Sequence, residues 1–182
     1  MSLTAQESEY FSKKIGRIPN NIEQQIVAAE WSEHCSYKSS KKHLKTLPTT
    51  GRGVINEKGF DSGVLDVGNG YVVTVHIESH NHPSAVEPYG GAATGVGGVI
   101  RDILSAGTRP IAIFDGLRFG NIENDNNARW LFKNAVSGIA DYGNCLGIPT
   151  IGGEVEFDQC YKNYALVDVA AIGFGKKDKL IK

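Results

Sequence analysis

The segment Val64–Ile77 constrains the fold more than any other part of the sequence. Two runs rich in β-branched residues are separated there by Gly68-Asn69-Gly70. Asn-Gly between two such runs is a strong signal for a tight β-hairpin, because both residues tolerate the positive φ angles of the turn. Neighbouring residues such as Val72 and Val73 point to opposite sides of a strand. Both faces of the resulting sheet therefore carry apolar side chains.

The remaining hydrophobic pattern predicts helices and further strands around this hairpin. We expect helices over 4–14, from 19 toward 31, over 92–106 with a C-terminal cap at Gly107, and over 126–143. We expect strands over 110–114, 149–151 and 164–173, a solvated helix or loop at 39–46, and a mobile loop at 51–61. The order predicts an α+β fold: a mostly antiparallel sheet with helices on one face. The other apolar face should then meet a second sheet.

Composition excludes several classes of protein. The chain has 182 residues, enough for one domain with a real core, and a net charge of −1. That charge argues against nucleic acid or an acidic membrane as a partner. No run approaches the roughly 20 apolar residues of a membrane span. Three cysteines without a CxxC pair indicate a reducing, cytoplasmic location.

The stretch that follows the hairpin concentrates groups that carry protons or bind metals. His76, Glu78, His80 and His82 alternate along an expected strand, so they would share one face, roughly 6–7 Å apart. Such a row is costly to bury unless something binds to it. A structural zinc site or satisfied core histidines is the alternative interpretation. Glu78 is a hard oxygen ligand that suits Mg²⁺, and Pro83 should end the strand and free the last two histidines.

A glycine-rich stretch, Gly90–Gly98, comes next and precedes Arg101 and Asp102. It lacks the Gly-Lys-Ser/Thr of a phosphate-binding Walker loop, and Ile100 stands where a dinucleotide fingerprint needs its third glycine. It indicates either close packing of a helix on the sheet or backbone N–H groups that bind phosphate at a helix N-terminus. Arg101 could bind a phosphate, and Asp102 could share a cation with Glu78.

Two further polar stretches have ordinary interpretations when taken alone. Trp31–Lys38 reads as the frayed polar end of a helix. Cys35 beside His34 is a weak candidate for a thiol nucleophile, because nucleophile and base are normally adjacent in space rather than in sequence. The carboxylates of Ile151–Asp158 are expected to be surface groups, with metal binding as the lesser alternative.

These stretches, in this order, resemble the synthetase subunit of phosphoribosylformylglycinamidine synthase, an enzyme of purine biosynthesis. The resemblance covers nearly the whole chain from about residue 16 onward. The matching segments are Trp31–Tyr37, Glu78–Ala85, Glu87–Gly98 with Arg101-Asp102, Arg109–Ala112 and Ile148–Glu154. The resemblance implies a fold like the N-domain of aminoimidazole ribonucleotide synthetase. It also implies one N-terminal synthetase-type domain over 1–182, with a helical extension at 1–50 and an α+β core at 63–175.

The resemblance further implies a reaction and its partners. ATP activates the amide oxygen of formylglycinamide ribonucleotide, and ammonia then displaces phosphate to give the amidine. In the multi-chain form a glutaminase subunit supplies the ammonia, and a small third subunit bridges the two. Phosphoryl transfer of this kind needs cations on the phosphates and accurate positioning more than covalent help from the protein.

The same resemblance assigns roles to individual residues. Catalysis is assigned to His34 and His80, with His80 as proton acceptor, and ATP binding to Tyr37 and His76. Substrate binding is assigned to Ser79, His80, Asn81, His82 and Arg101, and Mg²⁺ binding to Glu78 and Asp102. The sequence departs from the family pattern at two places. His76 stands where we expect an ATP-contacting lysine, and Asn163–Asp168 replaces Asn-Pro-Leu-Val-Asn.

Length separates this chain from the family pattern. Members contain tandem copies of an N-domain and a C-domain, and this chain looks like the first N-domain, which we expect to be inactive alone. In the family two N-domain sheets close into one barrel, so we expect the isolated chain to pair with itself as a homodimer. Two other functions stay open: a zinc-dependent hydrolase using His76, His80 and His82, and a non-catalytic dimerising module.

Overall fold

The computed structural model of the protein describes residues 2–55 and 60–181, in two compact units, Met1–Pro48 and Thr49–Lys182. The first unit is helical. Its elements are α1 (Ala5–Ile15), α2 (Asn21–Glu30), α3 (Glu33–Ser36) and α4 (Lys41–Leu44). The first two helices begin with capping boxes, in which Thr4 pairs with Glu7 and Asn20 with Glu23. The Trp31 ring lies 5.8 Å and 6.1 Å from the ring centres of Tyr10 and Phe11 in α1.

The second unit contains a six-stranded sheet. Its strands are β1 (Val54–Ile55), β2 (Gly63–Gly68), β3 (Tyr71–Ser79), β4 (Arg109–Phe119), β5 (Thr150–Phe157) and β6 (Ala165–Lys176). The spatial order is β1-β2-β3-β6-β4-β5, and every pairing is antiparallel except the parallel pair β4 and β5. Part of the expected 51–61 loop therefore forms β1, and residues 56–59 lie outside the described ranges.

The hairpin prediction is confirmed. β2 and β3 pair antiparallel around Asn69 and Gly70, whose φ angles are 53° and 77°. Positive φ at both central residues is the requirement that selects Asn-Gly for this turn. The long β3 then pairs along its whole length with β6, from Tyr71 opposite Lys176 to Ser79 opposite Asp168. This pairing fixes which β3 side chains face the helices.

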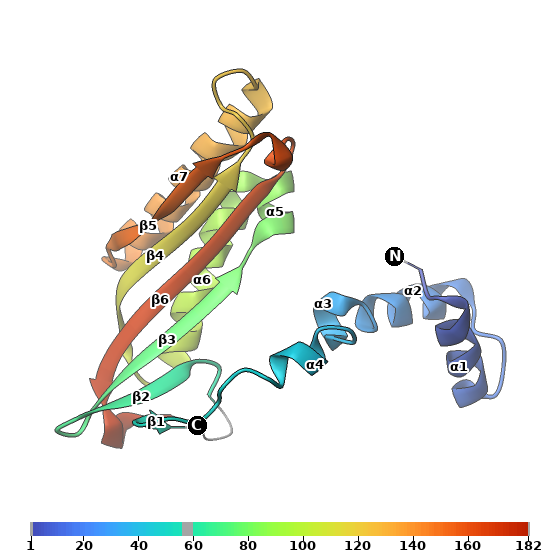
Figure 1. Ribbon diagram of the computed structural model, residues 1–182, viewed down its shortest axis with the longest axis horizontal. Coiled ribbons are helices and arrows are strands. Elements are labelled where there is room, and N and C mark those ends of the chain that lie inside the picture. The colour runs from blue at the N-terminus through green and yellow to red at the C-terminus, as the bar shows by residue number, and fades with distance from the viewer. Residues whose placement is uncertain (1, 56–59, 182) are drawn as a thin grey trace. The chain divides into compact units, whose positions relative to one another are not determined.

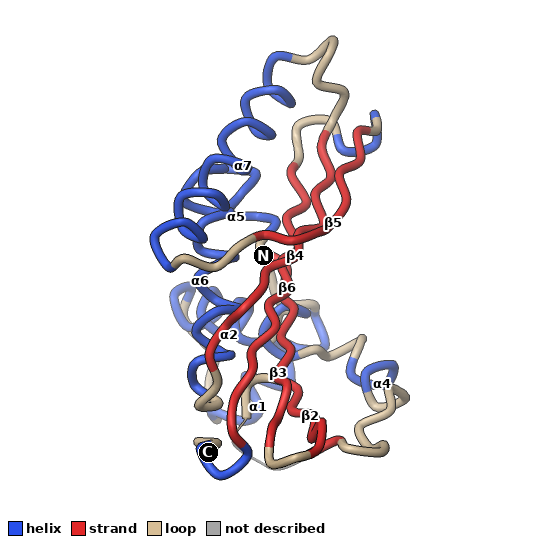
Figure 2. Tube along the Cα trace, turned by 90° about the vertical axis from the view of Figure 1, so that its left-hand side faces the viewer, coloured by secondary structure: helices blue, strands red, loops and turns tan. Residues whose placement is uncertain are grey.

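Three helices cover one face of the sheet: α5 (Asn81–Val86), α6 (Pro88–Ser105) and α7 (Asn126–Leu146). Figure 1 shows them together behind the strands, and Figure 2 shows the helical and strand layers side by side. The layer between them is the hydrophobic core, and among its fully buried members are Val96, Ile100, Ile103, Ile113, Phe119, Leu131, Val167 and Val169. The predicted α+β fold with helices on one face is confirmed. None of the helices in the described ranges is long and apolar enough to span a bilayer.

Glycines bring the two long helices into close contact. A Cβ on Gly138 of α7 would lie 2.1 Å from the backbone oxygen of Tyr89, and a Cβ on Gly97 of α6 would lie 2.8 Å from the Tyr142 ring. The glycine-rich stretch is thus inside α6 and serves helix packing. The stretch forms no separate turn, because the helix begins at Pro88, before the glycines. Phosphate binding at the N-terminus of this helix stays a prediction.

The other face of the sheet is open within the described part of the second unit. Alternate residues of β3 are exposed there, including Val75 (37%) and Ile77 (70%), while Val72 and Thr74 on the opposite side are fully buried. Phe174 of β6, opposite Val73, is 41% exposed. The predicted second apolar face therefore exists, and the sheet does not close on itself within these residues.

Candidate functional site

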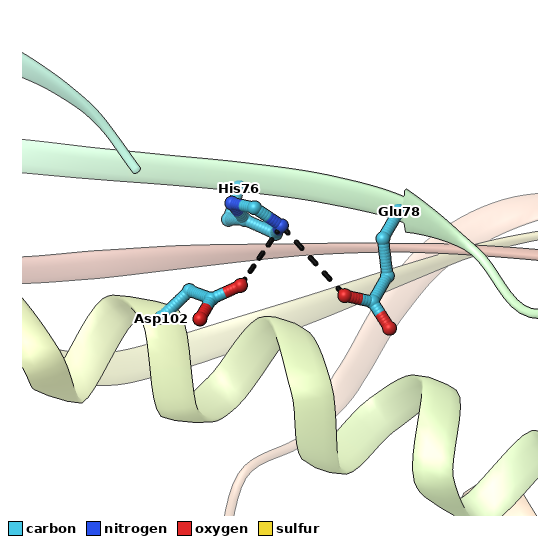
Figure 3. Close-up of side chains that lie close together, drawn as sticks. All are labelled: His76, Glu78 and Asp102. Atoms are coloured by element: carbon cyan, nitrogen blue, oxygen red, sulfur yellow. Dashed lines mark ion pairs between the residues drawn. The ribbon is translucent and has the colours of Figure 1, made fainter. Parts of the chain in front are cut away.

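The site lies where β3 passes α6. His76 and Glu78 sit two residues apart in β3, so both side chains point to the helix-covered side, and Asp102 reaches them from α6 (Figure 3). The Nε2 atom of His76 is 3.0 Å from Oδ2 of Asp102 and 3.8 Å from Oε2 of Glu78. The three side chains are 21–29% exposed. Strand alternation and one helix position thus gather two carboxylates and an imidazole at one half-buried point.

Gly98 leaves the space that Glu78 occupies. A Cβ at this position would lie 2.4 Å from Oε1 of Glu78, which is shorter than any real contact of a Cβ atom. Gly98 precedes Asp102 by four residues, so the two lie on the same face of α6. A Cβ on Gly95, one turn earlier, would lie 3.0 Å from the Cβ atom of His80. The glycines of this helix face therefore make room for the polar side chains of β3 and the residue that follows it.

The geometry fits a divalent cation. One ligand atom from each of His76, Glu78 and Asp102 lies within 4.8 Å of the other two. The Glu78 and Asp102 carboxylates are the hard oxygen ligands that Mg²⁺ prefers. Two carboxylates drawn together at a half-buried point repel each other unless a cation or protons lie between them. The two carboxylates therefore suit the Mg²⁺ that the family resemblance implies.

The histidine row does not continue as a strand. β3 ends at Ser79, His80 turns the chain with φ −128° and ψ 53°, and His82 lies in α5. The prediction that His80 and His82 share a strand face with His76 is wrong. Pro83 lies within α5 and does not end the strand.

Two hydrogen bonds to β6 and one from α5 fix this turn. The N–H of His80 donates to the carbonyl oxygen of Val167 at 2.7 Å. The N–H of Val167 donates to Oδ1 of Asn81 at 2.7 Å. The hydroxyl of Ser84 donates to the carbonyl oxygen of His80 at 2.6 Å. Asn81 thus has a structural role that sequence reasoning did not foresee.

The structure separates the three histidines. Nδ1 of His80 is 3.7 Å from Oε1 of Glu78, whereas Nε2 of His76 is 3.8 Å from the other carboxylate oxygen, Oε2. His82 instead contacts Tyr164, whose hydroxyl lies 2.8 Å from its Nδ1, with the two rings edge to face at 88°. Within the described ranges, the group able to hold a metal contains neither His80 nor His82. The ligand set of the zinc hydrolase alternative is therefore not assembled.

The remaining predicted substrate residues, Ser79 and Arg101, are neighbours of site residues in the sequence. Ser79 is exposed at the end of β3, and Arg101 is exposed one position before Asp102. Sequence reasoning did not single out Tyr164, which stands within a stretch already noted as a departure from the family pattern. It also missed Asp61, whose carbonyl oxygen is 2.6 Å from Nδ1 of His76. A backbone acceptor leaves no signal in the sequence.

His34 and Tyr37 belong to the first unit. His34 is exposed in the one-turn helix α3, and Tyr37 ends that helix with a positive φ of 50°. The Glu33 carboxylate accepts hydrogen bonds from the backbone and hydroxyl groups of Ser39 and Ser40. These bonds lower the pKa of Glu33 to about 2. The loop after Tyr37 is thus tied back to the helix that carries His34.

Comparison with known families identifies the class of protein. Residues 59–174 match the family described as AIR synthase related protein, N-terminal domain, which spans more than half of the chain. The chain therefore belongs to the AIR synthase related family. Residues 1–38 match a second family, the formylglycinamide ribonucleotide amidotransferase linker domain.

Similar proteins narrow this class. The chain is 52% identical to phosphoribosylformylglycinamidine synthase subunit PurL of Sulfolobus acidocaldarius, across 100% of this chain and 26% of that protein. It is 53% identical to the subunit of the same name from Caldanaerobacter subterraneus subsp. tengcongensis, across 100% of this chain and 25% of that protein. The chain thus spans about a quarter of the length of these relatives.

Solved structures of proteins with the same subunit name have a similar fold. The fold matches Thermotoga maritima PurL complexed with ADP and the same protein complexed with FGAR, each with a TM-score of 0.80 and 42% identity. Both matches cover 98% of this chain, and they cover 28% and 27% of those chains.

Proposed function

We propose that this chain forms the N-terminal synthetase part of an ATP-dependent ligase. The ligase is phosphoribosylformylglycinamidine synthase, which converts formylglycinamide ribonucleotide to the amidine with ammonia derived from glutamine. The observation that carries the proposal is the meeting of Glu78 and Asp102 between β3 and α6, in a chain 52% identical throughout to a PurL subunit. The T. maritima PurL complexes with ADP, ATP and FGAR support ATP and the ribonucleotide as ligands.

Glu78 and Asp102 would hold Mg²⁺, and bound Mg²⁺ would neutralise and position the phosphates of ATP. Nδ1 of His80 lies 3.7 Å from Oε1 of Glu78, one of the two carboxylates proposed to hold the cation. The imidazole of His80 is proposed to accept a proton from attacking ammonia. Ser79, Arg101 and His82 are proposed to contact the substrate, with Arg101 suited to phosphate. Asn81 is also proposed to contact the substrate, and its amide nitrogen is the better placed group because its oxygen already accepts a hydrogen bond from Val167.

His34 and Tyr37 lie in the helical N-terminal extension, residues 1–50, and the roles that the family resemblance gives them are proposed here. His34 would serve in catalysis, and Tyr37 would contact ATP. The match of residues 1–38 to an amidotransferase linker domain supports placing this segment within the same enzyme. We assign the whole chain to one synthetase-type domain that works in the cytoplasm.

The ammonia source would be a glutaminase subunit, joined through a small bridging subunit. The structure of PurLQS from Thermotoga maritima, whose matching chain is 43% identical to this one, supports assembly with other subunits.

A chimeric enzyme tests the ligase function. The matching N-terminal quarter of the S. acidocaldarius subunit is replaced by this chain, and phosphate release is measured with ATP, formylglycinamide ribonucleotide and ammonium chloride, which removes the need for a glutaminase. We expect ribonucleotide-dependent phosphate release. His80→Gln should lower it by about 100-fold or more, which is the usual contribution of a general base.

Two outcomes would refute the catalytic role proposed for this chain. The first is a folded chimera with no ribonucleotide-dependent turnover while the parent subunit is active. The second is a His80→Gln chimera of unchanged activity, which would favour the non-catalytic module. Circular dichroism of each variant verifies that loss of activity is not loss of folding.

We also propose that a second copy of the sheet covers the open face, so that the isolated chain forms a homodimer. The exposed side chains there are apolar at Val75, Ile77 and Phe174. Arg118 on the same face pairs with Glu154 and Glu156, so its positive charge is balanced within one copy. A face of this composition can meet its own copy without a net repulsion from that arginine.

Sedimentation velocity tests the dimer. We expect a concentration-dependent dimer that Ile77→Lys converts to a monomer, because the lysine would be buried without a partner. Glu9→Lys, an exposed change in α1, serves as the matched control and should leave the dimer intact. A monomer throughout, at protein concentrations up to about 1 mM, would contradict the proposal.

A further inference from the structure

His76 is held in the orientation of a metal ligand. Its Nδ1 atom is 2.6 Å from the carbonyl oxygen of Asp61, and a carbonyl oxygen can only accept a hydrogen bond. Nδ1 therefore carries the proton, and in the neutral ring Nε2 presents its lone pair to Asp102 and Glu78. Metal-binding histidines in proteins typically donate the other ring N–H to a carbonyl or carboxylate in this way.

The separations also match a coordination shell. Ligand atoms about 2.0–2.2 Å from one ion lie roughly 3 Å apart when they occupy neighbouring positions. Nε2 of His76 is 3.0 Å from Oδ2 of Asp102 and 3.8 Å from Oε2 of Glu78. In the neutral ring the 3.0 Å pair consists of two acceptors, and a cation between them removes the repulsion. All three groups are 21–29% exposed, which leaves room for water or phosphate oxygens as further ligands.

We propose that His76 is the third protein ligand of the cation held by Glu78 and Asp102. The site would then favour a divalent transition metal such as Mn²⁺, Co²⁺ or Zn²⁺ over Mg²⁺. Mg²⁺ takes oxygen ligands almost exclusively, whereas an imidazole nitrogen binds the later first-row metals well. The assignment replaces the role in ATP contact that the resemblance gave to His76. It concerns the same site as the proposed ligase, but it is tested with metal ions alone.

The first test is spectroscopic and uses the unmodified chain. Mn²⁺ is added at one equivalent, and the electron spin-echo spectrum is recorded for protein made with ordinary and with ¹⁵N-labelled histidine. We expect modulation from one directly bound imidazole nitrogen, which changes on labelling and disappears in His76→Gln. Bound Mn²⁺ without nitrogen coupling would overturn the assignment, as would no binding at millimolar Mn²⁺.

The second test measures affinity by calorimetry with Mn²⁺ and Mg²⁺. Mn²⁺ should bind on the order of tenfold or more tightly than Mg²⁺, and His76→Gln should remove most of that difference by weakening Mn²⁺. His43→Gln, in α4, is the matched control for adventitious binding to a surface histidine and should change neither affinity. Equal affinities, or a His76→Gln protein that retains the preference, would overturn the inference.

The two proposals can fail separately. A chimera that turns over with Mg²⁺ and shows no nitrogen coupling keeps the ligase and removes His76 from the metal. Nitrogen coupling in a chain whose chimera has no ribonucleotide-dependent turnover keeps the metal site and removes the ligase.

Discussion

The same strands form both faces of the sheet, but helices cover one face, and the other is exposed within the described part of the second unit. On the helix side, alternate residues such as Val72 and Ile113 are completely buried against α6 and α7. On the open side, Ile77 is 70% exposed, and a shallow depression that it helps to line also contains Arg118 and Asp168. The polar site lies on the covered face, where α6 brings Asp102 close to Glu78. One face thus supplies stability and chemistry, and the other is suited to association.

The largest expected effect comes from a matched pair of truncations across the sheet. Ile113→Ala removes a fully buried side chain from the covered face and should lower the free energy of unfolding by about 2–5 kcal/mol. Ile77→Ala, on the open face, should cost less than about 1 kcal/mol in dilute solution. Urea denaturation at low protein concentration measures both.

Repeating the two measurements at higher protein concentration tests whether the open face associates. If the open face pairs with a second copy, the cost of Ile77→Ala should grow with protein concentration while that of Ile113→Ala should not. Equal costs for the two truncations in dilute solution would show that the open face is already covered within one chain.

A smaller, pH-dependent effect is expected at Asp115 in β4. One carboxylate oxygen is buried without a hydrogen-bond partner among the described residues, and burial raises the pKa of Asp115 from 3.8 to about 6. The folded protein therefore holds this proton more tightly than the unfolded chain, and stability falls as the pH rises from about 4 through 6. Above that range the carboxylate is fully ionised, and its burial lowers the stability of the folded protein by the full amount.

Asp115→Asn should remove the penalty. We expect the variant to be more stable than the parent by about 1 kcal/mol at pH 8, after allowance for partial solvent exposure, and nearly unchanged at pH 4. Thermal unfolding at the two pH values measures the difference. A larger gain at pH 4 than at pH 8 would contradict the assignment of the shift to burial.

The smallest effect is expected from the charges of the open face. Arg118 pairs with Glu154 and, at 3.2 Å, with Glu156, whose carboxylates are both more than half exposed. Exposed pairs of this kind contribute little, so Arg118→Met should change the unfolding free energy of the monomer by less than about 1 kcal/mol. Urea denaturation checks this value. A loss of several kcal/mol would mean that the cluster is buried in the monomer.

Local patterns predicted most of the elements, and failed where a neighbouring element decides. The hairpin at Asn69-Gly70 and the helix α7 follow from turn chemistry and helical spacing, which act within a few residues. The strand expected to run to His82 stops at Ser79, because the carbonyl oxygen of Val167 in β6 captures the N–H of His80. Strand alternation foresaw that His76 and Glu78 share a face. It did not show that α6 begins at Pro88 and includes the glycines.

The sequence by itself determined the α+β class, the two apolar faces of the sheet and the residue types of the site, because periodicity and turn propensity are local properties. Tertiary structure decided which of these residues meet. Only the packing of α6 on β3, with Gly98 leaving space for Glu78, brings Asp102 to the carboxylate. The hydrogen bond from the His76 ring to the backbone of Asp61 likewise becomes visible only in the tertiary structure. The first contact joins residues far apart in the chain, and the second uses a backbone carbonyl oxygen, which every residue has. Neither contact can therefore be recognised from a local sequence pattern.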